Sequence, residues 1–155
     1  MKKQILGFLL MTLPFLIVSA QKVEFNTTKG AIAHGYDVVS YFGKNPVKGK
    51  HLYSTEYLQQ KFLFSSQENL KIFKNNPSKF VPQYGGWCSY EMAHNDKTDI
   101  DPKSYEIKNG KLYLFQDYVG TKNRRKWVSE GSDKLIKKAD YNWAQQTYKK
   151  RTTRR

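Results

Sequence analysis

The stretch YEIKNGKLYL, from Tyr105 to Leu114, predicts the fold of this chain most directly. Two alternating runs flank Asn109-Gly110, the dipeptide that a type I′ turn prefers, so an antiparallel hairpin is expected here. A second hairpin is expected from His51 to Gln60 and from Lys61 to Phe64, because both runs are rich in β-forming residues. The chain therefore contains strands that pair locally, which indicates an antiparallel arrangement.

Helices are expected between and after these hairpins. Ser65 with Glu68 matches a capping box, and Pro77 ends the helix that follows it. Further helices are predicted at Trp87–His94, Tyr118–Val128 and Ser132–Trp143. This order of elements favours an α+β fold, in which a small antiparallel sheet is covered by short helices in a single domain. No internal repeat, linker or second domain is evident.

The N-terminus has the pattern of a secretory signal peptide. Lys2 and Lys3 precede an apolar run of about 14 residues, and Val18-Ser19-Ala20 supplies small residues for cleavage. That run is shorter than the roughly 20 residues of a membrane-spanning helix, so we expect no transmembrane segment in the mature chain. An uncleaved N-terminal anchor is the alternative. The expected organisation is a signal peptide at 1–20, a leader at 21–30, a domain at 31–145 and a basic tail at 146–155.

The chain is strongly basic. Its 155 residues carry a formal charge of +14, which becomes +12 without Lys2 and Lys3. Such a charge favours anionic partners, although lysines spread along a chain also simply solvate its surface. The C-terminal end, from Lys149 onward, stands out as a cluster of basic residues. Export argues against nucleic acid as the natural partner, so an anionic surface in the cell envelope is the partner we consider.

Cys88 is the only cysteine, so it has no partner within the chain for a disulfide. A single thiol of this kind is either a buried apolar residue, a ligand for a soft metal, or a reactive group. The expected helix at Trp87 would place its N-terminal amides near the sulfur and favour the thiolate. His34 and Asp37 are the other candidate ligands, and Asp37 has an alternative role as the cap of a turn. His94 lies six residues after Cys88 and would not share its helix face.

Several motifs together resemble the YHS-domain family. The opening motif of that family is similar to GYDVVSYF at Gly35–Phe42. Others follow in order: Phe64–Asn69, Phe73, Asn76-Pro77, Phe80, Pro82, Tyr84–Cys88, Asp101-Pro102, Gly110–Leu114, Trp127 and Lys138–Trp143. The resemblance spans roughly Ala31 to Trp143 and is closest to the exported, single-domain branch of the family.

The resemblance implies a small α+β module related to domains that hold heavy metals through cysteines. Those relatives carry cysteines at positions where this chain has Ser40, Ser65 and Asn69. Serine and asparagine do not replace thiolate for a soft metal, so the relatives' site is not carried over.

No sequence signature of an enzyme is present. The chain lacks Gly-x-Ser-x-Gly, His-Glu-x-x-His and a phosphate-binding glycine loop. The sequence therefore predicts a periplasmic or secreted, non-enzymatic domain that binds a copper or zinc ion, with Cys88, His34 and Asp37 as candidate ligands. The alternatives are an interaction or scaffold domain for an anionic partner, and a thiol-based redox protein that uses Cys88.

Overall fold

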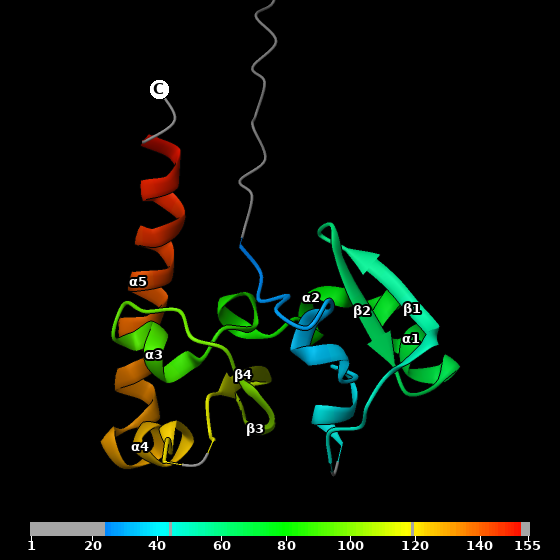
Figure 1. The fold of residues 1–155 in the computed structure, drawn as a ribbon, viewed down its shortest axis with the longest axis horizontal. Helices are drawn as coiled ribbons and strands as arrows, with labels where there is room; N and C mark the ends of the chain where they lie inside the picture. Colours follow the sequence, from blue (N-terminus) through cyan, green and yellow to red (C-terminus); the bar gives the residue numbers. More distant parts are fainter. Residues whose placement is uncertain (1–23, 44, 119, 153–155) are drawn as a thin grey trace, which may run out of the picture.

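The computed structural model describes residues 24–43, 45–118 and 120–152 (Figure 1). Its two antiparallel hairpins and short helices confirm the predicted α+β class. The expected signal peptide lies outside the described residues. Over the part that is described, no helix has both the length and the apolar character needed to cross a bilayer.

Both predicted hairpins are present, but they form separate two-stranded sheets rather than one sheet. The first pairs β1 (Lys50–Tyr57) with β2 (Gln60–Phe64), and the second pairs β3 (Asp101–Lys108) with β4 (Lys111–Phe115). The turn of the second hairpin holds Asn109 and Gly110 at φ values of 51° and 70°, as its sequence predicts.

The helices surround the hairpins and differ in their ends from the sequence prediction. The α-helices are α1 (Gln67–Asn75), α2 (Pro77–Phe80), α3 (Ser89–Ala93), α4 (Asn123–Glu130) and α5 (Ser132–Thr152). They are accompanied by a 3₁₀ turn, η2 (Ser40–Phe42), and by two turns with left-handed residues inside them, η1 (Ile32–Gly35) and η3 (Gln83–Gly86).

Helices α1, α3 and α4 start at residues that differ from the sequence prediction. The helix predicted at Trp87–His94 is shorter, and Cys88 lies at its N-cap rather than within it. The helix predicted from Tyr118 begins only at Asn123, which leaves a loop after β4. The cap of α1 is Ser66, whose Oγ accepts from the Asn69 amide at 3.2 Å, because the Ser65 side chain is engaged elsewhere.

Helix α5 runs along the same side of the molecule as α3 and α4 (Figure 1). The Asn142 amide donates to the carbonyl oxygens of Met92 and Ala93 at 3.0 and 3.2 Å, which fixes α5 to the end of α3. The helix extends to Thr152 and so passes through the predicted boundary between the domain and the basic tail.

The two hairpins share one hydrophobic core, and an aromatic residue from a helix fills each half of it. Phe73 of α1 lies 4.8 and 5.0 Å from Phe62 and Phe64 of β2, measured between ring centroids. Trp127 of α4 lies 5.7 and 5.4 Å from Tyr113 and Phe115 of β4. Phe73 and Trp127 are almost completely buried, so each stabilises the contact between its helix and its hairpin.

These parallel contacts belong to a structural repeat with a spacing of 51 residues, which the sequence analysis did not foresee. Ala33, His34 and Gly35 have φ values of 51°, 53° and 76°. The residues 51 positions later, at 84–86, repeat this unusual left-handed run with values of 55°, 64° and 83°. The hairpin turns at 58–59 and 109–110 also have positive φ and the same spacing.

The strand pairing repeats in the same way. Lys50 pairs with Phe64 and Ser54 with Leu63, with an irregularity between the two pairs. The same pattern occurs 51 residues later, where Asp101 pairs with Phe115 and Tyr105 with Leu114.

The repeats diverge after their hairpins. Asn69 of α1 corresponds to Asn123 of α4, and the aromatic residue lies four positions later in both, at Phe73 and Trp127. The spacing from the end of the hairpin differs, because Ser65 precedes Asn69 by four positions and Gln116 precedes Asn123 by seven. The second repeat (83–130) therefore has a longer connecting loop than the first repeat (32–75).

Candidate functional site

Each repeat buries one hydrogen-bond acceptor at the same place, two residues after the glycine that ends its left-handed turn. The acceptor is the Asp37 carboxylate in the first repeat and the Cys88 sulfur in the second, and both residues are 0% exposed. The backbone amides hold them in the same way. The Asp37 amide donates to the Val47 carbonyl at 2.9 Å, and the Cys88 amide donates to the Thr98 carbonyl at 3.1 Å.

The Asp37 centre consists of Asp37, Ser40, Ser65 and Asn69. Oδ1 of Asp37 accepts from the amides of Val39 and Ser40 at 2.9 and 3.4 Å. Oδ2 accepts from the Ser65 amide at 2.8 Å, from Ser65 Oγ at 2.7 Å and from Asn69 Nδ2 at 2.7 Å. Two carboxylate oxygens offer about four lone-pair sites, so these five donors saturate the group.

The Asp37 centre has a structural role. Its contacts to Val39 and Ser40 cap the turn that begins at Asp37, which was the alternative to a metal ligand for this residue. The centre also brings together Ser40, Ser65 and Asn69, the three positions at which the YHS resemblance implies cysteines in the relatives. In this chain those positions supply hydrogen-bond donors to a buried carboxylate.

The Cys88 centre consists of Cys88, Glu91, Gln116 and Asn123. The sulfur accepts from the Gln116 amide at 3.3 Å and from Asn123 Nδ2 at 3.6 Å. These donors correspond to Ser65 and Asn69 of the first repeat. The same Asn123 amide donates to Glu91 Oε1 at 2.7 Å, so it joins the thiol to a carboxylate. Cys88 is the N-cap residue of α3, but its sulfur accepts no capping hydrogen bond from the N-terminal amides that were expected to lie near it.

Residues in or next to the Cys88 hydrogen-bond network carry side-chain oxygens without partners. Four buried side-chain oxygens have no hydrogen bond within the described residues, namely Ser89 Oγ, Thr98 Oγ1, Asp117 Oδ1 and Asn123 Oδ1. Two of these residues bond directly to Cys88: the Thr98 carbonyl accepts from the Cys88 amide, and Asn123 Nδ2 donates to the Cys88 sulfur. The other two are sequence neighbours: Ser89 follows Cys88, and Asp117 follows Gln116, whose amide donates to the sulfur. Buried polar groups normally pair with protein, water or a bound ion.

His34 belongs to a third network. Its Nε2 lies 2.7 Å from Asp99 Oδ1, which also accepts from Asn26 Nδ2 at 2.8 Å. Burial alone would raise the pKa of Asp99, but hydrogen bonds from Asn26 and His34 outweigh it and hold the pKa below its usual value. The network ties the segment before η1 to the loop before β3.

The three predicted metal ligands therefore lie in three different hydrogen-bond networks. His34 contacts Asp99, Asp37 is saturated by its own donors, and Cys88 contacts Gln116 and Asn123. Within residues 24–43, 45–118 and 120–152, no group of three or more histidine, cysteine or acidic side chains is placed to hold a metal ion. Of the predicted ligands, Cys88 is the one whose hydrogen-bond partners include residues with an unpartnered buried oxygen, Thr98 and Asn123.

Sequence reasoning missed Glu91, Gln116 and Asn123 as members of this site. The signal that could have identified them is the repeated order of a strand ending in Phe, then Asn, then an aromatic residue four positions later. That order occurs as Phe64, Asn69 and Phe73 and again as Phe115, Asn123 and Trp127.

Comparison of the chain with protein-family models, with curated proteins and with solved structures found no match.

Proposed function

We propose that this protein is an exported, non-enzymatic YHS-type domain that binds a copper or zinc ion at the Cys88 centre. The observation that carries the proposal is the contrast between the two centres. The same framework saturates Asp37 with five donors, whereas four residues in or next to the Cys88 hydrogen-bond network each carry one buried oxygen without a partner in the described residues. A bound ion that draws on such oxygens would remove the cost of burying them without partners.

The chemistry of the centre suits a soft or borderline metal. Thiolate sulfur is the preferred protein ligand of Cu(I) and also binds Zn(II). The two N–H groups directed at the sulfur stabilise negative charge on it, as outer-shell donors do at metal sites. The Glu91 carboxylate would supply an oxygen ligand in place of His34 and Asp37, and an oxygen ligand suits Zn(II) better than Cu(I). Asn123 would act from the outer shell, where its amide donates to both the sulfur and Glu91.

Other features support the family and location within this proposal. Ser40, Ser65 and Asn69 meet around one buried group, as positions that form a metal site in related domains would. The signal-like N-terminus supports export. The redox alternative receives less support, because a reactive thiol needs access to its partner and Cys88 is 0% exposed.

Metal titration tests the proposal. The purified protein is titrated with Cu(I) under reducing conditions and with Zn(II), and bound metal and thermal stability are measured. The wild type is expected to bind one ion per chain and to unfold at a higher temperature with the metal, because the ligand binds only the folded state. Cys88→Ser is expected to lose both effects.

Two asparagine variants provide the matched control. Asn123→Ala is expected to weaken metal binding by about tenfold or more, as loss of an outer-shell partner does. Asn69→Ala changes the corresponding residue of the first repeat and should leave metal binding unchanged. Equal affinity in the wild type and Cys88→Ser would contradict the proposal.

A further inference from the structure

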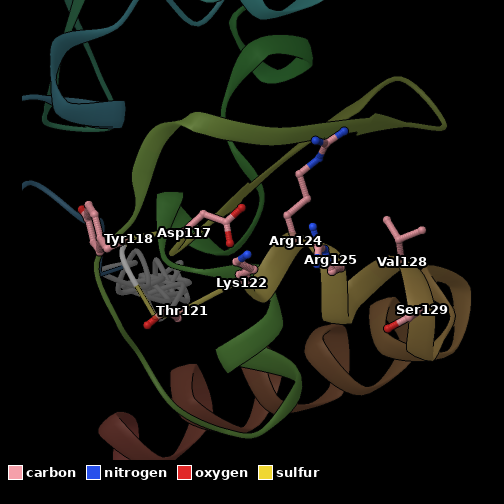
Figure 2. A pocket seen from close by; sticks show the side chains of 8 residues that line it. All are labelled: Asp117, Tyr118, Thr121, Lys122, Arg124, Arg125, Val128 and Ser129. Atoms are coloured by element: carbon pink, nitrogen blue, oxygen red, sulfur yellow. The ribbon is translucent and has the colours of Figure 1, made fainter.

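The longer loop of the second repeat borders a basic pocket. The pocket encloses about 610 Å³ between this loop and α4, and it is lined in part by Asp117, Tyr118, Lys122, Arg124 and Arg125 (Figure 2). Its volume lies within the range of roughly 300–1,000 Å³ that is typical of small-molecule sites. The pocket therefore suits a small ligand more than an extended macromolecular surface.

The charge of the pocket is positive and uncompensated. Lys122, Arg124 and Arg125 are exposed, and none of the three forms an ion pair with a carboxylate in the described parts of the chain. Asp117 is the one acidic residue of the lining, and its Oδ2 already accepts from Ser104 Oγ at 3.0 Å. Three cations and one carboxylate leave a charge of about +2, which matches a dianion.

The pocket also offers apolar surface beside the charges. Figure 2 shows Tyr118 at one edge and Val128 at the other, with the basic side chains between them. Tyr118 is 47% exposed and Val128 is 58% exposed, although both are large apolar groups. The Tyr118 hydroxyl donates to the Ile100 carbonyl, so the ring is held in place at this edge.

The first repeat shows that the scaffold does not require these basic residues. When α1 is aligned with α4 through Asn69 and Asn123, the positions of Lys122, Arg124 and Arg125 carry Glu68, Leu70 and Lys71. Leu70 is buried in the core, whereas Arg124 is exposed. The cluster of cations thus arises only where the loop is lengthened.

From these observations we infer that the pocket binds a small organic phosphate, with the phosphoryl group on Lys122, Arg124 and Arg125 and the organic group against Tyr118 and Val128. Guanidinium groups bind phosphate oxygens in bidentate fashion, which favours arginine at such sites. A phosphate monoester is largely dianionic above its second pKa of about 6, which matches the charge of the pocket. The pocket is distinct from the Cys88 sulfur and its donors, although Asp117 both lines the pocket and adjoins Gln116 of the Cys88 centre.

Binding of phenyl phosphate at pH 7.5 and low salt tests the inference. Dissociation constants come from titration of amide chemical shifts, and the shifts of residues 117–129 locate the site. Phenyl phosphate is expected to bind more tightly than inorganic phosphate, and phenol is expected to give no saturable shifts. Affinity should fall as ionic strength rises, because exposed charges are screened.

Variants decide whether the pocket is the site. Arg124→Gln with Arg125→Gln is expected to weaken phenyl phosphate binding by about tenfold or more, through loss of two charge-assisted contacts. Lys71→Gln removes the cation at the position of Arg125 in the first repeat and should leave affinity unchanged. Equal weakening by Lys71→Gln would show a general effect of charge and overturn the inference. So would unchanged affinity in the double variant, or shifts confined to residues outside the pocket.

Discussion

The two repeats of this protein place different chemistry in the same position. The first repeat buries a carboxylate and surrounds it with five donors, whereas the second buries a thiol with two donors and leaves nearby oxygens unpartnered. The backbone turns, the strand pairing and the aromatic residue that packs on each hairpin are alike. We therefore assign a structural role to the first repeat, and our proposal places metal binding in the second.

The comparison predicts that the Asp37 centre matters most for stability. Asp37→Ala leaves the donors on Ser65 and Asn69 without their acceptor inside the protein. The free energy of unfolding is expected to fall by about 3–5 kcal/mol, because several buried donors lose their partner at once. Urea unfolding followed by circular dichroism measures this change.

Asp37→Asn is the companion variant, because it keeps the size of the side chain and one acceptor oxygen. It should be less damaging than Asp37→Ala. If Asp37→Ala unfolds at the same urea concentration as the wild type, the first centre is not the structural element that we describe.

Replacing the corresponding asparagines, Asn69 and Asn123, should lower the free energy of unfolding by less than Asp37→Ala does, and it compares the two repeats directly. Asn69→Ala removes a donor from the buried Asp37 carboxylate and is expected to cost about 1–2 kcal/mol of stability. Asn123→Ala is expected to cost less than Asn69→Ala, although it also removes the donor to Glu91 Oε1. Sulfur is a weak acceptor, the half-buried Glu91 can bind water instead, and an unpartnered oxygen is removed at the same time. Parallel thermal and urea unfolding of the metal-free variants tests the order. A larger loss in Asn123→Ala would reverse the roles that we assign to the two centres.

The smallest predicted effect concerns the link between His34 and Asp99. The pKa of Asp99 is lower in the folded protein than its unfolded value of about 3.9. Its stabilising contribution is therefore present above that pH and is lost as the pH falls through the lower folded value. The pair is partly exposed, with 28% of the Asp99 side chain accessible, so solvent screens the effect.

Asp99→Asn tests this link. Its melting temperature should be roughly 1–3 °C below that of the wild type at pH 6, and the difference should shrink towards pH 2. Melting curves recorded at half-unit steps of pH would show it. A constant difference across that range would mean that the carboxylate charge is not responsible.

Local sequence patterns predicted the individual helices and strands of this fold better than the arrangement of the strands into sheets. Asn109-Gly110 identified the second hairpin, and the serine-rich entry to α1 identified that helix, because turn and cap preferences act within a few residues. The grouping of four strands into two separate sheets was not predicted, because it depends on packing between elements that lie far apart in the chain.

The candidate site was predicted only in part, for the same reason. Cys88 is distinctive as the single thiol, whereas His34 and Asp37 became candidates through residue type and their place in or beside the Gly35–Asp37 motif. Their partners are Asp99, 65 positions after His34, and Ser65 and Asn69, 28 and 32 positions after Asp37. Contacts over such distances leave no local pattern in the sequence.

By itself the sequence determined the α+β class, the hairpin at Asn109-Gly110, the basic character and the presence of one thiol. The tertiary structure alone decided that Asp37 is saturated, that Cys88 joins Glu91 through Asn123, and that a longer loop opens a basic pocket in the second repeat. The physical reason is that composition and turn preference are local. Whether a buried group is satisfied depends instead on donors that only folding brings to it.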